Sequence, residues 1–425
     1  MTVLLIILLT TLVLISGLPV AFGLIAVATI MLLLKDVSLF MVTQNLLGAI
    51  DNFVLVSIPM FLFMSNILLK GGVGRSLFSA TQAWVGHLPG GLGIATLLSC
   101  GVFSAINGSS VATAATIGSV AIPEMSSRGY PQRFAVGMVA AGGTLGILIP
   151  PSIPLIVYGV ITEQSIGDLF LAGIGPGILL VILFGIYAYV YARVTKTMAE
   201  TQKASWSERI SATRDALPVL VLALAIVGGI YGGIFTPTEA AAAGVGLAIL
   251  ITKFWLKTLT LEGFWQSAKD ALHTTVVILL VVAGAKLLSQ AITIYQIPNE
   301  ITAIVSQTIA SKEFFLVVMA LILLAVGCFL EPISIILIFV PVFMPAALHF
   351  GMDPIFLGIF FVLMVEIGLI TPPIGLNLFV IQAISKCDFK TATMGAIPFV
   401  IIMLFGTVIL VAAPWIALAI PFGGF

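Results

Sequence analysis

The sequence predicts an all-α protein that crosses a membrane many times. The chain has 425 residues, of which 60% are hydrophobic and only 8% are charged, whereas a soluble domain has about 25% charged residues. The mean hydropathy is +1.26. Residues 1–34 contain no charged side chain. They lack the basic region and cleavage site of a signal peptide, so we expect membrane segments from the start of the chain.

The composition also excludes several classes of protein. High hydrophobicity with little charge argues against both a soluble domain and a disordered chain. The 17 basic and 17 acidic residues give a net charge of zero, so nothing favours binding to nucleic acid. The three cysteines Cys100, Cys328 and Cys387 show no zinc-binding spacing and are too few for a disulfide framework.

The charge-free runs predict where the chain crosses the bilayer, since a span needs about 20 apolar residues. Run 76–123 is too long for one span, and Gly17-Leu18-Pro19 interrupts run 1–34. The basic stretch 196–213 predicts a cytoplasmic linker, with Trp206 on a helix at the interface. In chain order we expect spans at 2–16, 19–34, 52–70, 133–163, 168–194, 214–234, 237–256, 271–294, 354–386 and 391–421, with hairpins at 88–127 and 312–349.

Glycine and proline recur at a constant offset of 222 residues. The matched pairs are Pro123 with Pro345, Gly129 with Gly351, Gly146 with Gly368, Pro150-Pro151 with Pro372-Pro373, and Pro176 with Pro398. Such a repeat divides the chain into a first half, residues 1–195, and a second half, residues 214–425. Each half has five spans, an odd number, so the two halves have opposite orientations in the bilayer, as in secondary transporters.

The distribution of basic residues predicts the topology independently. With 195–215 inside, the loops that contain Lys70, Arg128, Lys253 and Lys386 also lie inside. Loops 35–51 and 295–312 and both termini would then lie outside.

Each hairpin has a polar centre where a continuous span would have none. Asn107-Gly108-Ser109-Ser110 lies in the middle of the first, and Glu331-Pro332-Ile333-Ser334 in the middle of the second. The arms are short for full spans, which favours re-entrant hairpins. Two ordinary spans joined by a tight loop are the alternative.

The two Pro-Pro pairs predict breaks in the helices 133–163 and 354–386. Proline lacks an N–H group and leaves carbonyls one turn earlier without a donor. Such carbonyls, with nearby hydroxyl and amide oxygens, suit Na⁺, while helix N-termini favour anions. A simple kink is the alternative reading of each pair.

Other polar residues allow two readings. Thr144, Ser152, Thr371 and Asn377 flank the breaks, either as ligands or bonded to their own helix backbone. Glu331 and Glu366 are acids in apolar segments, and each is either functional or a structural partner. Ser109 and Ser110 have no base nearby in the sequence, so we do not expect an enzyme.

Several strings together resemble one transporter family. They are Leu88-Pro89-Gly90-Gly91, the string from Phe103 to Ser110, Pro123-Glu124-Met125, Gly129-Tyr130, the string from Gly146 to Ser152 and the string from Gly368 to Gly375. They resemble the large membrane subunit, of DctM type, of tripartite ATP-independent periplasmic (TRAP) transporters. The sequence is also similar to members that carry sialic acid.

The resemblance implies a fold and a function. The fold would be that of the ion-transporter superfamily, with an elevator motion, in the inner membrane of a bacterium. The function would be Na⁺-coupled uptake of an organic acid. Two partners are implied, namely a small four-helix membrane subunit and a periplasmic substrate-binding protein.

The resemblance also assigns candidate site residues. The implied ligands of one sodium ion are Ser104, Asn107, Gly108, Ser109, Gly146 and Pro150, and those of another are Gly327, Glu331, Gly368, Thr371 and Gly375. We call the polar centre of each hairpin its tip. The second tip, Glu331-Pro332-Ile333-Ser334, lacks the Asn-Gly of the first. The candidate substrate contacts are Ser110, Ser152, Ser334 and Asn377.

Three other functions stay open on the sequence alone. A Na⁺–dicarboxylate symporter of the same superfamily would work without a binding protein. An intramembrane enzyme would need a polar dyad on facing helices, which the sequence does not offer. A channel is the third alternative.

Overall fold

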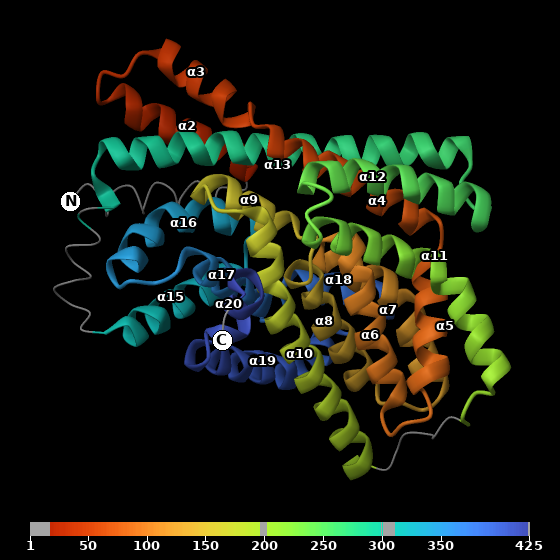
Figure 1. The fold of residues 1–425 in the computed structure, drawn as a ribbon. Coiled ribbons are helices and arrows are strands. Elements are labelled where there is room, and N and C mark those ends of the chain that lie inside the picture. The colour runs from red at the N-terminus through yellow and green to blue at the C-terminus, as the bar shows by residue number, and fades with distance from the viewer. Residues whose placement is uncertain (1–17, 196–201, 299, 301–310, 424–425) are drawn as a thin grey trace.

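The computed structural model describes residues 18–195, 202–298, 300 and 311–423. These residues form a helical assembly (Figure 1). Within them, eight helical stretches are long and apolar enough to cross a membrane. The prediction of an all-α, multi-span protein is therefore confirmed, while the expected span 2–16 lies outside the described residues.

The first half of the chain, up to residue 195, contains both long and short helices. In order they are α2 (Val20–Leu33), α3 (Leu39–Ile50), the 3₁₀-helix η1 (Phe53–Val56), α4 (Ser57–Lys70), α5 (Val73–Val85), α6 (Gly91–Asn107), α7 (Ser110–Ser127), α8 (Gln132–Leu148), α9 (Ile153–Thr162) and α10 (Ile166–Thr195).

The rest of the chain repeats this mixture. Its elements are α11 (Trp206–Tyr231), α12 (Pro237–Leu250), the π-helix η2 (Ile251–Trp255), α13 (Leu261–Ile294), α15 (Lys312–Gly327), α16 (Pro332–His349), α17 (Pro354–Leu369), α18 (Leu376–Ser385), α19 (Phe389–Ala412) and α20 (Trp415–Phe422).

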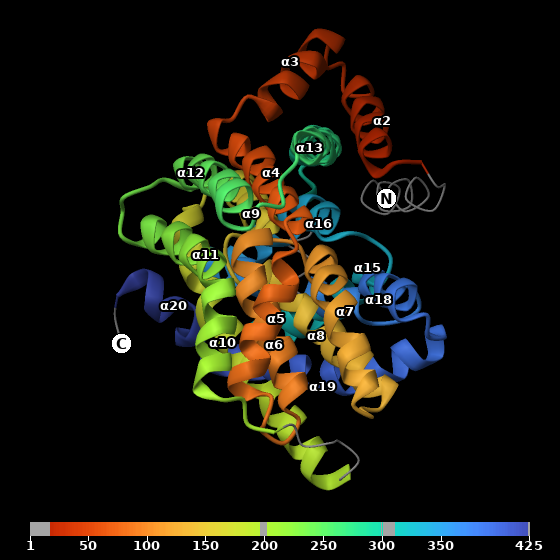
Figure 2. The same cartoon turned by 90° about the vertical axis from the view of Figure 1, so that its right-hand side faces the viewer.

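One long helix, α13, forms an edge of the molecule. It contacts α2, α3, α4 and α16, and in Figure 1 it runs along the top with α2 and α3 above it. Figure 2 views it end-on, with most of the other helices below. Its 34 residues correspond to about 50 Å of helix, which is more than the ~30 Å of a hydrocarbon core.

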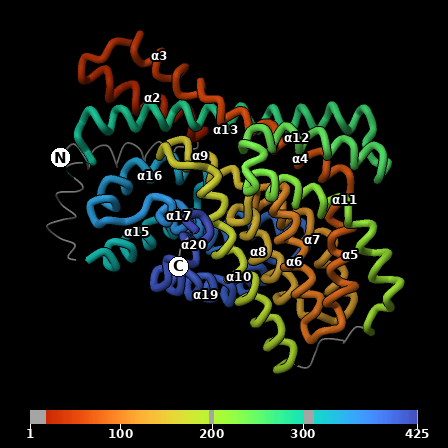
Figure 3. Tube along the Cα trace, in the orientation of Figure 1, coloured from red at the N-terminus to blue at the C-terminus, as the bar shows by residue number. Residues whose placement is uncertain are grey.

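Helix bounds recur at the offset found in the sequence. Helix α7 covers residues 110–127 and α16 covers 332–349, and both ends are 222 residues apart. Helices α8 and α17 begin at Gln132 and Pro354, with the same offset. In Figure 3 helices α5 to α8 lie on the right and α15 to α17 on the left. Helix α18 packs against α7, beside which Figure 2 labels it.

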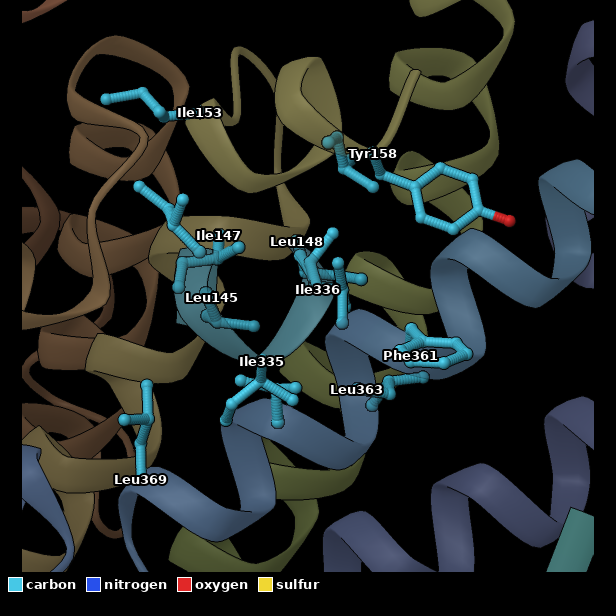
Figure 4. Close-up of a cluster of buried hydrophobic side chains, with 14 of the residues drawn as sticks. Leu145, Ile147, Leu148, Ile153, Tyr158, Ile335, Ile336, Phe361, Leu363 and Leu369 are labelled. Carbon is cyan, nitrogen blue, oxygen red and sulfur yellow. The ribbon is translucent and has the colours of Figure 1, made fainter. Parts of the chain in front are cut away.

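Apolar side chains of both halves share one core. Leu145 and Leu148 of α8 lie near Ile335 and Ile336 of α16 and Phe361 of α17 (Figure 4); all five are buried. The hydroxyl of Tyr158, a fully buried residue of α9, donates to the Pro354 carbonyl at 2.5 Å. This bond satisfies the hydroxyl within an apolar core.

Some expected loops are helical. The expected outside loop 35–51 contains α3, because Ser38 caps an uncharged apolar segment through the Met41 N–H. The linker 196–213 is similarly shortened, since α11 begins at Trp206 and continues into the span. Ser205 and Glu208 form a capping box there, which starts a helix efficiently.

Other boundaries also differ from the expectation. Helix α5 occupies part of the segment between Lys70 and the first hairpin, where we expected a loop with Lys70 and Arg75 and no span. Helix α13 begins at Leu261, ten residues before the expected span 271–294. The expected span 391–421 is divided into α19 and α20 at Pro414, which cannot continue the hydrogen-bond ladder.

Candidate functional site

The first tip is a tight polar turn between α6 and α7. Gly108 has a φ of +63°, a conformation that favours glycine. The Ser109 hydroxyl caps α7 by accepting from the Ala112 N–H at 3.4 Å. Asn107 Oδ1 accepts from the Ser65 hydroxyl on α4, and its Nδ2 donates to the Ser109 carbonyl at 3.2 Å. The side chains of Asn107, before Gly108, and of Ser109, after it, therefore both form hydrogen bonds that hold the turn in place.

The second tip joins α15 to α16 and is capped by a carboxylate. Glu331 Oε1 accepts from the Ser334 N–H at 3.0 Å and from the Ser334 hydroxyl at 2.8 Å. Glu331 and Ser109 are 222 residues apart and are the N-caps of equivalent helices. The position of the cap is thus repeated, whereas its chemistry and charge are not.

The first break separates α8 from α9 at Pro150-Pro151. Neither proline has an N–H group, so the carbonyls of Gly146 and Ile147 lack their helical donors. Ser152, which is fully buried, caps α9 through the Leu155 N–H at 3.4 Å. This break therefore combines carbonyls that lack their i+4 donors with a new helix N-terminus.

The first tip packs directly against the first break. A Cβ atom at Gly146 would lie 2.6 Å from the Ser109 carbonyl oxygen. One at Gly108 would lie 2.6 Å from the Pro151 carbonyl oxygen. The two backbones approach this closely only because glycine occupies both positions.

The second tip and the second break approach each other in a comparable way. The Gly375 N–H donates to the Cys328 carbonyl at 3.1 Å. A Cβ atom at Gly368 would lie 2.6 Å from the Gly327 Cα. Thr371, beside the Pro372-Pro373 pair, donates its hydroxyl to the Ile367 carbonyl at 2.6 Å. Both Pro-Pro peptide bonds are cis.

Both tips line one cavity of about 670 Å³. Gly108, Ser109 and Ser110 come from the first tip, and Glu331 and Ser334 from the second. The remaining wall includes apolar residues of α2 and α13, among them Val20, Ala21, Val277, Ile278 and Val281. The N-termini of α7 and α16 both reach this cavity, and its described lining contains no Lys, Arg or His.

Several predicted site residues are not among the residues that line this cavity. Ser104 donates to the Cys100 carbonyl at 2.5 Å, and Thr371 bonds to its own helix, as hydroxyls in membrane helices commonly do. Ser152 is used as a cap. Asn377 instead reaches across to the first tip and donates to the Ser110 hydroxyl at 2.5 Å.

Three features of the site were not predicted. Ser65 on α4 stands beside Asn66, and Thr274 on α13 stands between His273 and Thr275. Only the fold places Ser65 at Asn107 and Thr274 at the cavity. The third is a hydrogen bond of 3.0 Å from the Ser110 hydroxyl to Glu366 Oε2. The sequence marked Glu366 as an acid in an apolar segment, but 256 residues separate it from Ser110.

The residues at the tips and breaks fit the sodium ions that the resemblance implies. Hydroxyl, amide and carbonyl oxygens gather at the first tip and break, around Asn107, Ser109 and Gly146. The second tip adds the Glu331 carboxylate. Carbonyls of unwound helices are the usual sodium ligands of transporters with broken helices.

Comparison with known proteins identifies the family. Residues 5–416 match the family described as tripartite ATP-independent periplasmic transporter, DctM component. The C4-dicarboxylate TRAP transporter large permease protein DctM of Pseudomonas aeruginosa is 41% identical over 399 residues, covering 94% of this chain and 93% of that protein. The ectoine TRAP transporter large permease protein TeaC of Halomonas elongata is 38% identical, covering 88% of each.

One further relative and one solved structure are also similar to the chain. The sialic acid TRAP transporter large permease protein SiaM of Vibrio cholerae is 34% identical, covering 96% of this chain and 95% of that protein. The crystal structure of the Alcanivorax borkumensis YdaH transporter has a similar fold, with a TM-score of 0.60 and 15% identity, over 90% of this chain and 88% of that one. The chain therefore belongs to the DctM family and is the large permease component of a TRAP transporter, a multi-pass membrane protein and not an enzyme.

Proposed function

We propose that this permease imports an organic acid together with Na⁺ through the cavity between the two tips. The observation that carries the proposal is the electrostatic character of that cavity. Its described lining contains one charged residue, the acid Glu331, and no cationic side chain. Sodium ions at the tips, with the N-termini of α7 and α16, would supply the positive charge that a carboxylate substrate needs.

An elevator motion is part of the proposal. The cavity lies between the tips on one side and α2 and α13 on the other. Helices α2 and α13 pack against each other and would form the stationary part. The tips pack onto the breaks by close backbone contacts and would move together as a unit. The facing α13 side chains Val277, Ile278 and Val281 are apolar, which suits sliding.

We also propose the inverted repeat and the topology that goes with it. The domains are 1–195 and 214–425, with re-entrant hairpins at 88–127 and 312–349. The shared offset of α7 with α16, and of α8 with α17, supports the repeat. The segment around 205 would face the cytoplasm of a bacterial cell whose inner membrane holds the protein.

The proposed partners are a small four-helix membrane subunit and a periplasmic substrate-binding protein. The tripartite family to which the chain belongs supports them. Identity is 41% to a C4-dicarboxylate permease and 34% to a sialic acid permease. We therefore expect a carboxylate, with a C4-dicarboxylate as the first substrate to test and sialic acid as the second.

The test is uptake by vesicles that contain the purified permease with its small subunit. Radioactive substrate is supplied with the binding protein under an inward Na⁺ gradient, a K⁺ gradient or no gradient. We expect uptake only with both Na⁺ and the binding protein. Uptake of free substrate without the binding protein would favour a stand-alone symporter, and uptake unaffected by the sodium gradient would refute the coupling.

A further inference from the structure

A buried cluster of three polar side chains connects the first tip with the second break. The Ser110 hydroxyl on α7 donates to Glu366 Oε2 on α17 at 3.0 Å. Asn377 Nδ2 on α18 donates to the same hydroxyl at 2.5 Å. All three residues are at most 1% exposed. The cluster therefore lies within the protein core.

Ser110 is the single point that holds this cluster together. Glu366 Oε1 and Asn377 Oδ1 are buried and have no hydrogen-bond partner in the described part of the chain. The bonds to Ser110 are consequently the hydrogen bonds that orient both side chains. A movement of Ser110 would release both of them at once.

The cluster joins two different groups of proposed sodium ligands. Ser110 directly follows Ser109 of the first group. Glu366 lies two residues before Gly368, and Asn377 lies two residues after Gly375, both of the second group. Helix α18 also packs along α7. An ion that fixes one group would therefore constrain the other through these hydrogen bonds.

The repeat does not duplicate this connection. Residues 222 positions away from Ser110, Glu366 and Asn377 are Pro332, Thr144 and Leu155. A proline and a leucine cannot form the same side-chain hydrogen bonds. The two halves thus contribute equivalent tips and breaks, but the hydrogen-bonded cluster has no counterpart at the repeat offset. The cluster is therefore not a consequence of the repeat.

We infer that Glu366 is a positioning residue that makes sodium binding at the two sites cooperative. By holding Ser110, it transmits the ordering of one ligand group to the other. The role depends on the hydrogen bond and not on the charge of the carboxylate. The inference rests on the proposed sodium coupling and adds an interaction between the two ions.

The test measures sodium binding to the purified permease without substrate. Thermal unfolding is followed as a function of Na⁺ concentration at constant ionic strength, with choline as the replacement cation. The number of bound ions is measured separately with radioactive sodium. We expect about two ions and a Hill coefficient well above one in the unaltered protein.

Three variants separate the hydrogen bond from the charge. Glu366→Leu and Ser110→Ala both break the connection, and we expect the Hill coefficient to fall to about one while two ions still bind. Glu366→Gln keeps an acceptor for the Ser110 hydroxyl, and we expect it to keep the cooperativity. Thr275→Val is the matched control, because Thr275 is buried and bonds only to its own helix, at the Ala271 carbonyl.

Each possible result of the sodium titrations bears on a different part of the inference. Unchanged cooperativity in Glu366→Leu and Ser110→Ala would overturn the inference, as would a Glu366→Gln variant that behaves like Glu366→Leu. Loss of one bound ion in these variants would make Glu366 a ligand instead. An unaltered protein that binds sodium with a Hill coefficient of one would refute only the coupling, whereas no sodium binding at all would refute the proposed function.

Discussion

The two tips occupy equivalent places in the chain but are held by different chemistry. The first is capped by the Ser109 hydroxyl and closes on its break by glycine packing at Gly146. The second is capped by the Glu331 carboxylate, and beside its own glycine contact between Gly368 and Gly327 it has a hydrogen bond from the Gly375 N–H to the Cys328 carbonyl. The repeat thus preserves where helices start and stop, while the groups that would meet an ion have diverged. The two proposed ion sites should consequently differ in affinity.

The largest expected effect on uptake comes from replacing both prolines of one break, so that the interrupted helix can continue. Replacing Pro150 and Pro151 with alanine restores two N–H donors, so that α8 can continue its ladder and occupy the carbonyls of Gly146 and Ile147. Interior proline costs a helix about 3 kcal/mol. We expect a folded protein without sodium-dependent uptake, measured in vesicles alongside thermal stability with and without Na⁺.

The corresponding change at Pro372 and Pro373 tests whether the halves are equivalent. If both breaks form ion sites, each double variant should lose part of the sodium-dependent stabilisation. Full sodium-dependent stabilisation in both double variants would mean that the Pro-Pro breaks serve packing and not ion binding.

A smaller effect is expected from Gly146→Ala. The added methyl group would lie 2.6 Å from the Ser109 carbonyl oxygen, a backbone atom, and would push the first tip away from its break. Overpacking of this kind costs about 1–3 kcal/mol. We expect a lower melting temperature and weaker sodium stabilisation.

Gly185→Ala provides the matched control for this substitution. No atom lies within 4 Å of a Cβ at Gly185 in α10, so alanine there should be neutral or slightly stabilising. Equal melting temperatures and equal sodium responses for the two alanine variants would argue against the close contact between tip and break.

The smallest effect should come from the caps themselves. Ser109→Ala removes the hydroxyl that accepts from the Ala112 N–H, a loss of about 0.5–2 kcal/mol for a helix cap. If the hydroxyl is also a sodium ligand, the half-saturating Na⁺ concentration should rise up to about tenfold. Glu331→Gln keeps an acceptor for Ser334 and should change helix stability less. A sodium titration of Ser109→Ala that matches the unaltered protein would remove this hydroxyl from the ligands.

The interruptions of helices could be predicted from the sequence better than the side-chain contacts between helices. Proline and glycine act locally, so Pro150-Pro151 and Gly108 marked the ends of helices without knowledge of the fold. Helix α3 was missed because the prediction relied on charge-free length and not on caps such as Ser38. Helix α5 begins after Gly72 without a side-chain cap, so no such signal marked its start. The Ser110–Glu366 bond was beyond prediction, since it depends on how α7 and α17 pack. The predicted sodium ligands remain predictions.

The absence of a cationic side chain from the described lining of the cavity has a consequence for the order of events. Without bound sodium, Glu331 would repel an arriving carboxylate, and the helix N-termini alone would have to offset that repulsion. The substrate would therefore enter after the ions and leave once they have dissociated. Under the proposed function, this sequence protects the cell against uncoupled leakage, because a cavity without ions holds its substrate too weakly to carry it in either direction.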